Sequence, residues 1–315
     1  MPREVQQPIQ LLPIFRERVW GRDNLAPWFP VIPRQSRIGE IWFTFEENST
    51  SIGPSLGELI REHPEMLGTA ADPRHPGICP LLAKLLFTSD RLSVQVHPDD
   101  AYAEQHHQSL GKTEAWYVVD AEPAGELAAG VCRAVTADEF RKAAESGEMN
   151  HLLRWRKVTA GDVVFLPAGT VHALGAGLTV FEIQESSDIT YRLYDYGRPR
   201  ELHLDDGMAV ARLNPEDARV TAKALAPWRD ELVESDYFRL ERLRPKESMW
   251  IASGLPYYLI LVCIKGSGFI DGQTFAPGQA WMVPARNAEV QIDGRDAEWI
   301  LAYSAKEPVE GLFSA

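Results

Sequence analysis

A repeated pattern of glycine, strand and proline most limits the folds open to this chain. Residues 158–172 read VTAGDVVFLPAGTVH and residues 275–289 read FAPGQAWMVPARNAE, and each copy holds a glycine, five further residues and a proline. Short extended segments between glycine and proline turns are typical of small β-barrels and jelly rolls. The second copy indicates two such units. The copies differ at their last residue, which is His172 in the first and Glu289 in the second.

The remaining turn signals divide the chain into short strands and a few helices. Strands are expected at 37–45, 91–97, 112–120, 131–135, 162–167, 178–184 and 189–194, and throughout 237–302. Helices are expected at 55–67, 99–108, 136–154, 205–212 and 215–223. Two of them begin with a capping box, Ser55 with Glu58 and Thr136 with Glu139. Residues 81–87 are almost wholly apolar and fit either a buried strand or the end of a helix.

The predicted fold is mainly β, with two jelly-roll barrels and a few helical insertions in the N-terminal half. A boundary near residues 224–230 divides the chain into residues 1–225 and residues 226–315. We expect the first domain to bind a metal and the second, which lacks the histidine, to bind none.

Two of the predicted strands carry polar side chains at alternate positions. The first strand has Ser93, Gln95 and His97, and the second has Lys112, Glu114 and Trp116. Alternate side chains of a strand share one face, so neighbouring strands of a barrel would bring an amide oxygen, an imidazole and a carboxylate together inside it. His172 is the candidate fourth ligand. The sequence therefore predicts a metal site made of Gln95, His97, Glu114 and His172.

Composition limits the partners of the chain. A formal net charge of −13 argues against a nucleic-acid or anionic-membrane partner, so an anionic substrate would need a local basic pocket. The three cysteines have no paired spacing, which favours a reducing compartment over a disulfide framework. The first residues hold no apolar leader, and no run is long enough to span a membrane. We expect a cytoplasmic protein, a monomer or a small homo-oligomer.

Several motifs resemble known families. The glycine–proline pattern ending at His172 resembles the second signature of the cupin superfamily. The segments QVHP, GKTE, IGEIW, LPAGTVHAL and FEIQESSDITYRLYDYGR together resemble the type I phosphomannose isomerases of the short bacterial kind, over nearly the whole chain. This resemblance implies two cupin barrels, one zinc ion per chain, and interconversion of mannose 6-phosphate and fructose 6-phosphate, with the phosphosugar as the small-molecule partner.

The resemblance also implies roles for individual residues. The metal ligands of the family fall on Gln95, His97, Glu114 and His172. Its catalytic arginine falls on Arg192, its GKTE lysine on Lys112, and an acidic proton-transfer partner on Glu182.

The residue types suit this chemistry. An arginine fork fits a phosphate or a developing oxyanion, and a partly buried Glu182 with a raised pKa would act as a general acid or base. Lys112 and Ser93 are expected to contact the substrate or its phosphate. Two imidazoles, an amide and one carboxylate would leave a divalent cation electrophilic. The ligand types alone also suit cobalt, manganese or iron.

Other interpretations stay open from the sequence. A metal-dependent cupin dioxygenase is one alternative, although such sites usually hold more imidazoles, and a non-catalytic sugar-binding cupin is another. Gln95 and Ser93 could form only structural hydrogen bonds, Lys112 could pair with a neighbouring carboxylate, and Arg192 could pair with Asp195.

Overall fold

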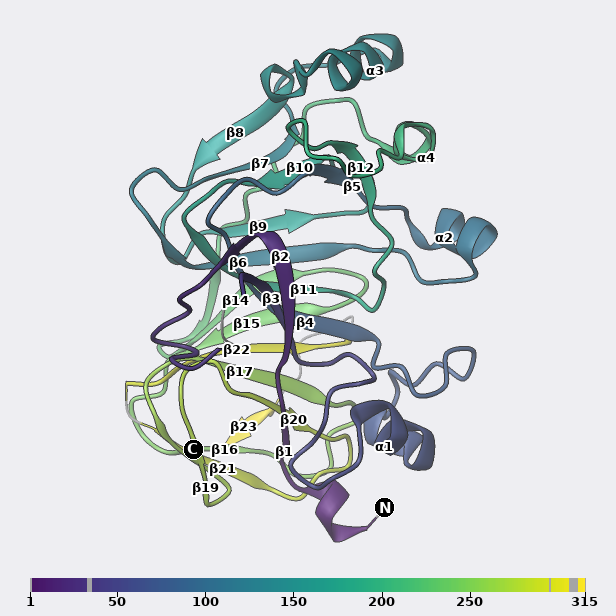
Figure 1. Ribbon diagram of the computed structural model, residues 1–315. Coiled ribbons are helices and arrows are strands. Elements are labelled where there is room, and N and C mark those ends of the chain that lie inside the picture. The colour runs from purple at the N-terminus through teal and green to yellow at the C-terminus, as the bar shows by residue number, and fades with distance from the viewer. Residues whose placement is uncertain (1, 33–35, 295, 306–310, 315) are drawn as a thin grey trace.

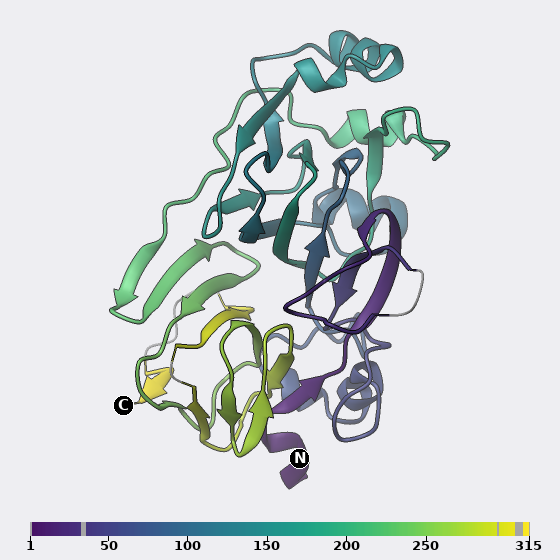
Figure 2. The ribbon, with the colours of Figure 1, turned by 60° about the vertical axis from the view of Figure 1, so that its left-hand side comes forward.

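The computed structural model describes residues 2–32, 36–294, 296–305 and 311–314. It consists of two β-barrels, one above the other in Figures 1 and 2, with most of the helices beside the upper one. We name the upper unit the first barrel and the lower unit the second barrel. The expectation of a mainly β protein made of two jelly rolls is confirmed.

The first barrel is made of two facing sheets. One sheet has the strand order β2 (Ile14–Arg22), β3 (Ile38–Trp42), β4 (Leu81–Phe87), β11 (Leu178–Glu185), β6 (Glu114–Ala121) and β9 (Val163–Leu166). The other has the order β12 (Tyr191–Tyr194), β5 (Val94–Val96), β10 (His172–Leu174), β7 (Glu126–Val131) and β8 (Leu153–Lys157).

The second barrel repeats this plan. Its larger sheet has the order β1 (Ile9–Leu11), β20 (Ala280–Val283), β17 (Leu259–Lys265), β22 (Glu298–Tyr303), β15 (Arg239–Leu243), β14 (Arg229–Glu234) and β13 (Lys223–Ala226). Its smaller sheet has the order β19 (Gln273–Phe275), β18 (Gly268–Ile270), β21 (Val290–Asp293), β16 (Met249–Ile251) and β23 (Phe313–Ser314).

Two strands bear on the expected division of the chain at residue 225. Strand β1 lies near the N-terminus yet pairs with β20 of the second barrel, and β13 spans the expected boundary. The assignment of residues 1–225 and 226–315 to separate domains stays a prediction.

Strand β4 shows how the two barrels pack together. All seven of its residues are buried. Leu81, Ala83, Leu85 and Phe87 face a core that they share with apolar residues of the second barrel, such as Ile260 and Met282. The alternate positions face the inside of the first barrel, where Lys84 lines a cavity. A strand covered on both faces reads as a continuous apolar run, which explains why this segment was ambiguous in sequence.

The helices lie where capping residues place them, but they are shorter than expected. Helix α1 (Leu56–Glu62) begins with the predicted capping box of Ser55 and Glu58, and α2 (Asp100–His107) is capped by Asp99. Helix α4 spans Leu204–Val210. None of the described helices is long and apolar enough to cross a membrane.

The expectation of one helix over residues 136–154 is wrong in its second half. Helix α3 (Ala137–Ser146) ends at Gly147, whose φ of 85° is a left-handed conformation that suits glycine. A single 3-10 turn and strand β8 follow. The strong helix formers at the start of the segment led to a predicted helix that runs on past Gly147.

Two further expectations are wrong. Residues 215–223 form no helix and instead run beside the first barrel, where Arg219 bridges to Val164. The strand expected at 131–135 lies earlier, at Glu126–Val131. Its small residues are buried on both faces of the sheet, Ala129 with Trp116 inside the barrel and Ala128 with Phe140 of the core outside it. This burial outweighs the weak strand propensity of alanine.

Candidate metal centre and cavity

Three side chains meet inside the first barrel. His172 begins β10 and lies opposite Gln95 of β5 in the strand register, and His97 directly follows Val96, the last residue of β5. Glu114 begins β6 in the facing sheet. Ligand atoms of His97, Glu114 and His172 all lie within 4.8 Å of one another, and the three residues are buried. Three of the four residues predicted as ligands therefore meet inside the barrel.

The two histidines are held ready to bind a cation. The Nδ1 atom of His97 lies 2.8 Å from the carbonyl oxygen of Ile189, and that of His172 lies 2.8 Å from the carbonyl oxygen of Thr170. Because a carbonyl can only accept, each Nδ1 carries the hydrogen and each Nε2 presents a lone pair. Burial lowers the pKa of His172 to about 4 and that of His97 well below its usual value, so both rings are neutral.

The atoms that face the centre lack hydrogen-bond partners. Among the described residues, both Nε2 atoms and both Glu114 oxygens are buried without one. The Nε2 atoms of His97 and His172 lie 3.5 Å and 3.3 Å from the nearer Glu114 oxygen, where two acceptors face each other. Burial also raises the pKa of the Glu114 carboxyl, against the opposing charge of Lys112. A bound cation would satisfy every one of these atoms, so the residues fit a metal ion.

Gln95 lies in β5, and Ser93 directly precedes this strand. Both line a cavity of about 400 Å³ that opens beside the three clustered residues. Val94 and Val96, at the alternate positions, pack in an apolar core outside the barrel with Phe140 of α3. The strand therefore presents the expected polar row to the interior.

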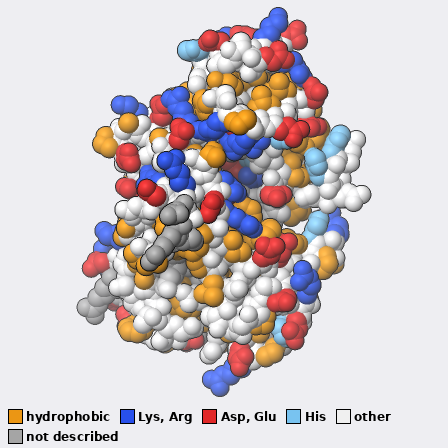
Figure 3. Space-filling model, viewed as in Figure 1, with side chains coloured by type: hydrophobic (Ala, Val, Ile, Leu, Met, Phe, Trp, Pro, Cys, Tyr) orange, Lys and Arg blue, Asp and Glu red, His pale blue; other side chains and the backbone are white. Residues whose placement is uncertain are grey.

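The cavity is basic although the whole chain is acidic. Its lining includes five cationic residues, Arg18, Lys84, Lys112, Arg192 and Arg200, and three acidic residues, Glu40, Glu182 and Asp188. Figure 3 shows Lys and Arg side chains gathering on the upper half of the visible face, over the first barrel. In a chain with a net charge of −13, this local excess of positive charge favours an anionic ligand.

Arg192 lines the cavity from β12. It lies opposite Gln95 in the register of β12 and β5. Its guanidinium donates one hydrogen bond, 2.8 Å long, to the carbonyl oxygen of Glu201, while its buried Nε has no partner among the described residues. Burial and the neighbouring Arg200 lower the pKa of Arg192. Asp195, the alternative partner considered from sequence, binds Arg198 and Arg200.

Lys112 pairs with the candidate ligand Glu114 while it lines the cavity. Its Nζ lies 3.3 Å from Glu114 Oε2. Burial opposes the charge of Lys112, but the carboxylates of Glu114 and Glu182 raise its pKa, so the side chain stays an ammonium.

Glu182 differs from expectation in its electrostatics. Burial alone would raise the pKa of its carboxyl, but Lys84 and Lys112 lower it below its usual value. The condition set from the sequence, a pKa raised by partial burial, is therefore not met, and Glu182 is an ionised carboxylate. One of its oxygens accepts a 2.9 Å hydrogen bond from Trp116 Nε1. The Trp116 ring also meets His172 edge-on, with centroids 5.3 Å apart.

Lys84 is the cavity residue that the sequence pattern could have revealed and did not. Its Nζ lies 3.1 Å from Glu182 Oε1 and 4.8 Å from the centre of the Trp42 ring. A single lysine at an inward-facing position of LLAKLLF was the available signal. Arg200 lies on a loop beyond β12, where no periodic pattern marks it.

The fold and the centre define a class. A jelly-roll barrel with a buried cluster of two histidines and a glutamate, beside a basic cavity lined by Gln95 and Lys112, is a cupin-type protein with a candidate metal site.

Comparisons with known proteins narrow this class. Residues 9–143 match the family described as phosphomannose isomerase type I, catalytic domain. The chain is 36% identical to the mannose-6-phosphate isomerase ManA of Bacillus subtilis, over 94% of this chain and 99% of that protein. It is 33% identical to a mannose-6-phosphate isomerase of Streptococcus mutans, over 95% and 98%.

Structural similarity agrees with the sequence comparisons. The crystal structure of a mannose 6-phosphate isomerase from Bacillus subtilis superposes with a TM-score of 0.85 at 30% identity, covering 95% of this chain and 100% of that one. The chain therefore belongs to the type I phosphomannose isomerase family.

Proposed function

We propose that the chain interconverts mannose 6-phosphate and fructose 6-phosphate in a metal-dependent reaction. The observation that carries the proposal is the basic cavity beside a buried cluster of ligand atoms that make no hydrogen bond among the described residues. The cations suit the phosphate, and the ligand cluster suits a metal beside the sugar carbons. Family membership and relatives with this activity support the same substrate.

His97, Glu114 and His172 would hold the metal, with Gln95 as the fourth ligand, and the proposed ion is a single Zn²⁺. When bound, it supplies an electrophile that stabilises negative charge on the oxygens at C1 and C2. With one carboxylate among the ligands, the centre keeps a net positive charge of about one.

The chain's own residues would transfer the protons and bind the substrate. Conversion of the open-chain aldose into the ketose moves one proton from C2 to C1 and one from O2 to O1, so no atom enters or leaves. Ionised Glu182 can accept the C2 proton and return it to C1. Lys112, an ammonium, donates hydrogen bonds to oxygens on which charge develops. Arg192 and Ser93 bind the phosphate, with Lys112 as a further contact.

The cellular location and the oligomeric state expected from the sequence belong to the same proposal. A cytoplasmic location fits Cys79, Cys132 and Cys263, which are all free thiols. A monomer or a small homo-oligomer remains the proposed assembly.

The test is a coupled assay with mannose 6-phosphate, before and after chelation and with metal added back. We expect turnover that disappears on chelation, returns with zinc and is unchanged without oxygen. Arg192→Ala should lose most turnover while it retains its metal. Turnover that depends on oxygen, or none with any hexose phosphate, would refute the proposal.

A further inference from the structure

Gln184 is a buried amide on the inner face of β11, two residues beyond Glu182. Its side chain is fully buried, and it lies opposite Glu114 in the strand register. Its Oε1 accepts a hydrogen bond of 2.5 Å from Lys84 Nζ. Its Nε2 donates to the carbonyl oxygens of Glu185, at 2.9 Å, and Ser187, at 2.5 Å. Both hydrogens and the oxygen of the amide are therefore engaged.

These partners allow the Gln184 amide only one orientation. Turning it over would aim the NH₂ group at the Lys84 ammonium, which has no acceptor. It would also set the amide oxygen against two carbonyl oxygens. The side chain therefore always presents an acceptor to Lys84.

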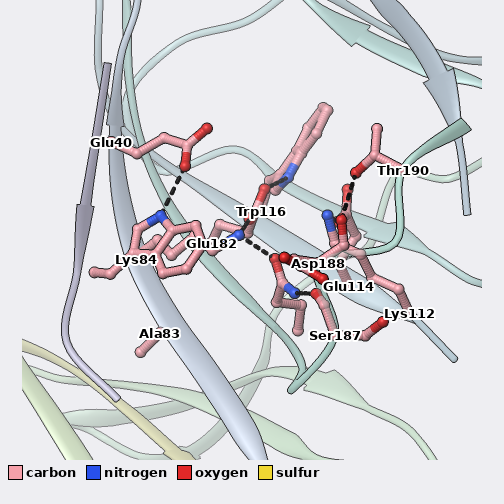
Figure 4. A network of polar contacts seen from close by, with 12 residues as sticks. Glu40, Ala83, Lys84, Lys112, Glu114, Trp116, Glu182, Ser187, Asp188 and Thr190 are labelled. Atoms are coloured by element: carbon pink, nitrogen blue, oxygen red, sulfur yellow. Dashed lines mark hydrogen bonds and ion pairs between the residues drawn. The ribbon is translucent and has the colours of Figure 1, made fainter. Parts of the chain in front are cut away.

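Lys84 is consequently held in a defined geometry. An ammonium has three hydrogens, and the oxygens of Glu182 and Gln184 accept from Lys84 Nζ on neighbouring positions of β11. The Trp42 ring packs against the same ammonium. Figure 4 shows Lys84 beside Glu182, with Ser187 and Asp188 close by. Since Lys84 lines the cavity, its remaining hydrogen is available to a ligand there.

We propose that Gln184 is a positioning residue for the proposed isomerase reaction and acts through Lys84. By fixing the ammonium against Glu182, it directs the remaining Lys84 hydrogen to a substrate oxygen in the cavity. A neutral amide does this without a second carboxylate that would compete with the substrate for the charge of Lys84. The inference rests on the proposed function and adds a residue that does not itself line the cavity.

A double-mutant cycle tests the proposal. Lys84→Met, Gln184→Met and the double variant are compared in kcat/KM for mannose 6-phosphate, with metal content and Tm measured for each. We expect Lys84→Met to lower kcat/KM by about 100-fold or more and Gln184→Met by about 10- to 100-fold, the range of a lost hydrogen bond to a charged group. The double variant should match Lys84→Met within about 2-fold.

A matched control and a second variant sharpen the cycle. Thr179 is a buried polar residue of the same strand outside the cavity lining, so Thr179→Val should leave kcat/KM unchanged. If Gln184→Met does not fold, Gln184→Asn keeps an amide but withdraws it from Lys84, and the cycle is run with that change.

The outcomes separate the inference from the proposed function. Losses that multiply in the double variant would show that Gln184 acts independently of Lys84 and would overturn the inference alone. Full activity of the folded Gln184→Met protein would also overturn it. A wild-type protein without turnover overturns the proposed function, and the inference with it.

Discussion

The two barrels have the same arrangement of strands but different side chains in their interiors. Aligning the two sequence copies on their glycines places Leu166 on Val283. Leu166 lies opposite Glu114 in the first barrel, and Val283 lies opposite Leu259 in the second. The position of the candidate carboxylate ligand is therefore occupied by leucine in the second barrel, just as the position of His172 is occupied by glutamate.

The correspondence extends across the sheet. Glu182 lies opposite Lys84 in the first barrel, and the matching pair in the second is Leu301 opposite Glu241. Glu241 is fully buried, binds Arg229 through both oxygens and accepts a hydrogen bond from Tyr303.

Large apolar rings fill the rest of the second interior. Trp299 packs against Phe275 with ring centroids 4.4 Å apart, and Trp281 belongs to the same core. The comparison shows how one frame serves two purposes. The first interior leaves a cavity beside the His–Glu–His cluster, whereas in the second interior Glu241 is paired with Arg229 and aromatic rings take up the remaining space.

The largest effect is expected when Glu114 of the first barrel is replaced by leucine, the residue at the matching position of the second barrel. Glu114→Leu removes the only carboxylate of the His–Glu–His cluster. We expect metal binding to be lost and turnover to fall on the order of 1,000-fold, measured by elemental analysis and the coupled assay. Leu259→Met, the matched change in the second barrel, should alter neither. A Glu114→Leu protein with a full complement of metal would break the comparison.

A substitution in the interior of the second barrel should lower the stability of the protein rather than its activity. Glu241→Leu leaves the partly buried guanidinium of Arg229 without its carboxylate partner, and breaking such a pair costs up to about 3–5 kcal/mol. Denaturant unfolding should show this loss, while kcat of the folded protein stays unchanged. A large fall in kcat with normal stability would give the second barrel a catalytic role.

The ligand row could be predicted because strand alternation alone sets which side chains share a face. The inward direction of Gln95 and Glu114 could be predicted from the two-residue period of a β-strand alone. The pKa of Glu182 could not be predicted, because its cause is Lys84 on a strand far away in sequence. The end of α3 was missed because local helix formers outweighed a single stop signal at Gly147.

A smaller effect is expected at the rim of the first barrel. Asp195 is buried and binds Arg200 through both oxygens, at 2.5 Å and 2.7 Å, and Arg200 lines the cavity. Asp195→Asn should loosen Arg200 and raise KM about 10-fold with a smaller change in kcat, as expected when ground-state binding is lost. Asp90→Asn, at an exposed partner of Arg198, is the control. Equal falls in kcat for both variants would contradict a binding role.

The smallest effect concerns the surface between the barrels. Glu185 and Asp100 of the first barrel share a pocket with Asp236 and Tyr237 of the second. Burial, with the charge of Asp100, raises the pKa of Glu185 from 4.5 to about 8. Between these values the folded state holds a proton that the unfolded state has released, so stability falls as pH rises through this range.

Replacement of Glu185 by its neutral analogue should remove that dependence. We expect Glu185→Gln to gain Tm relative to wild type between pH 5 and pH 8, in thermal unfolding measured at several pH values. Parallel pH profiles for the two proteins would exclude Glu185 as the cause.

The most direct measurement is anomalous diffraction from crystals of the protein grown with zinc, recorded at the zinc absorption edge. The account predicts one strong peak per chain inside the first barrel, within bonding distance of Nε2 of His97 and His172 and of the Glu114 carboxylate. A peak elsewhere, or none at this position, would contradict it.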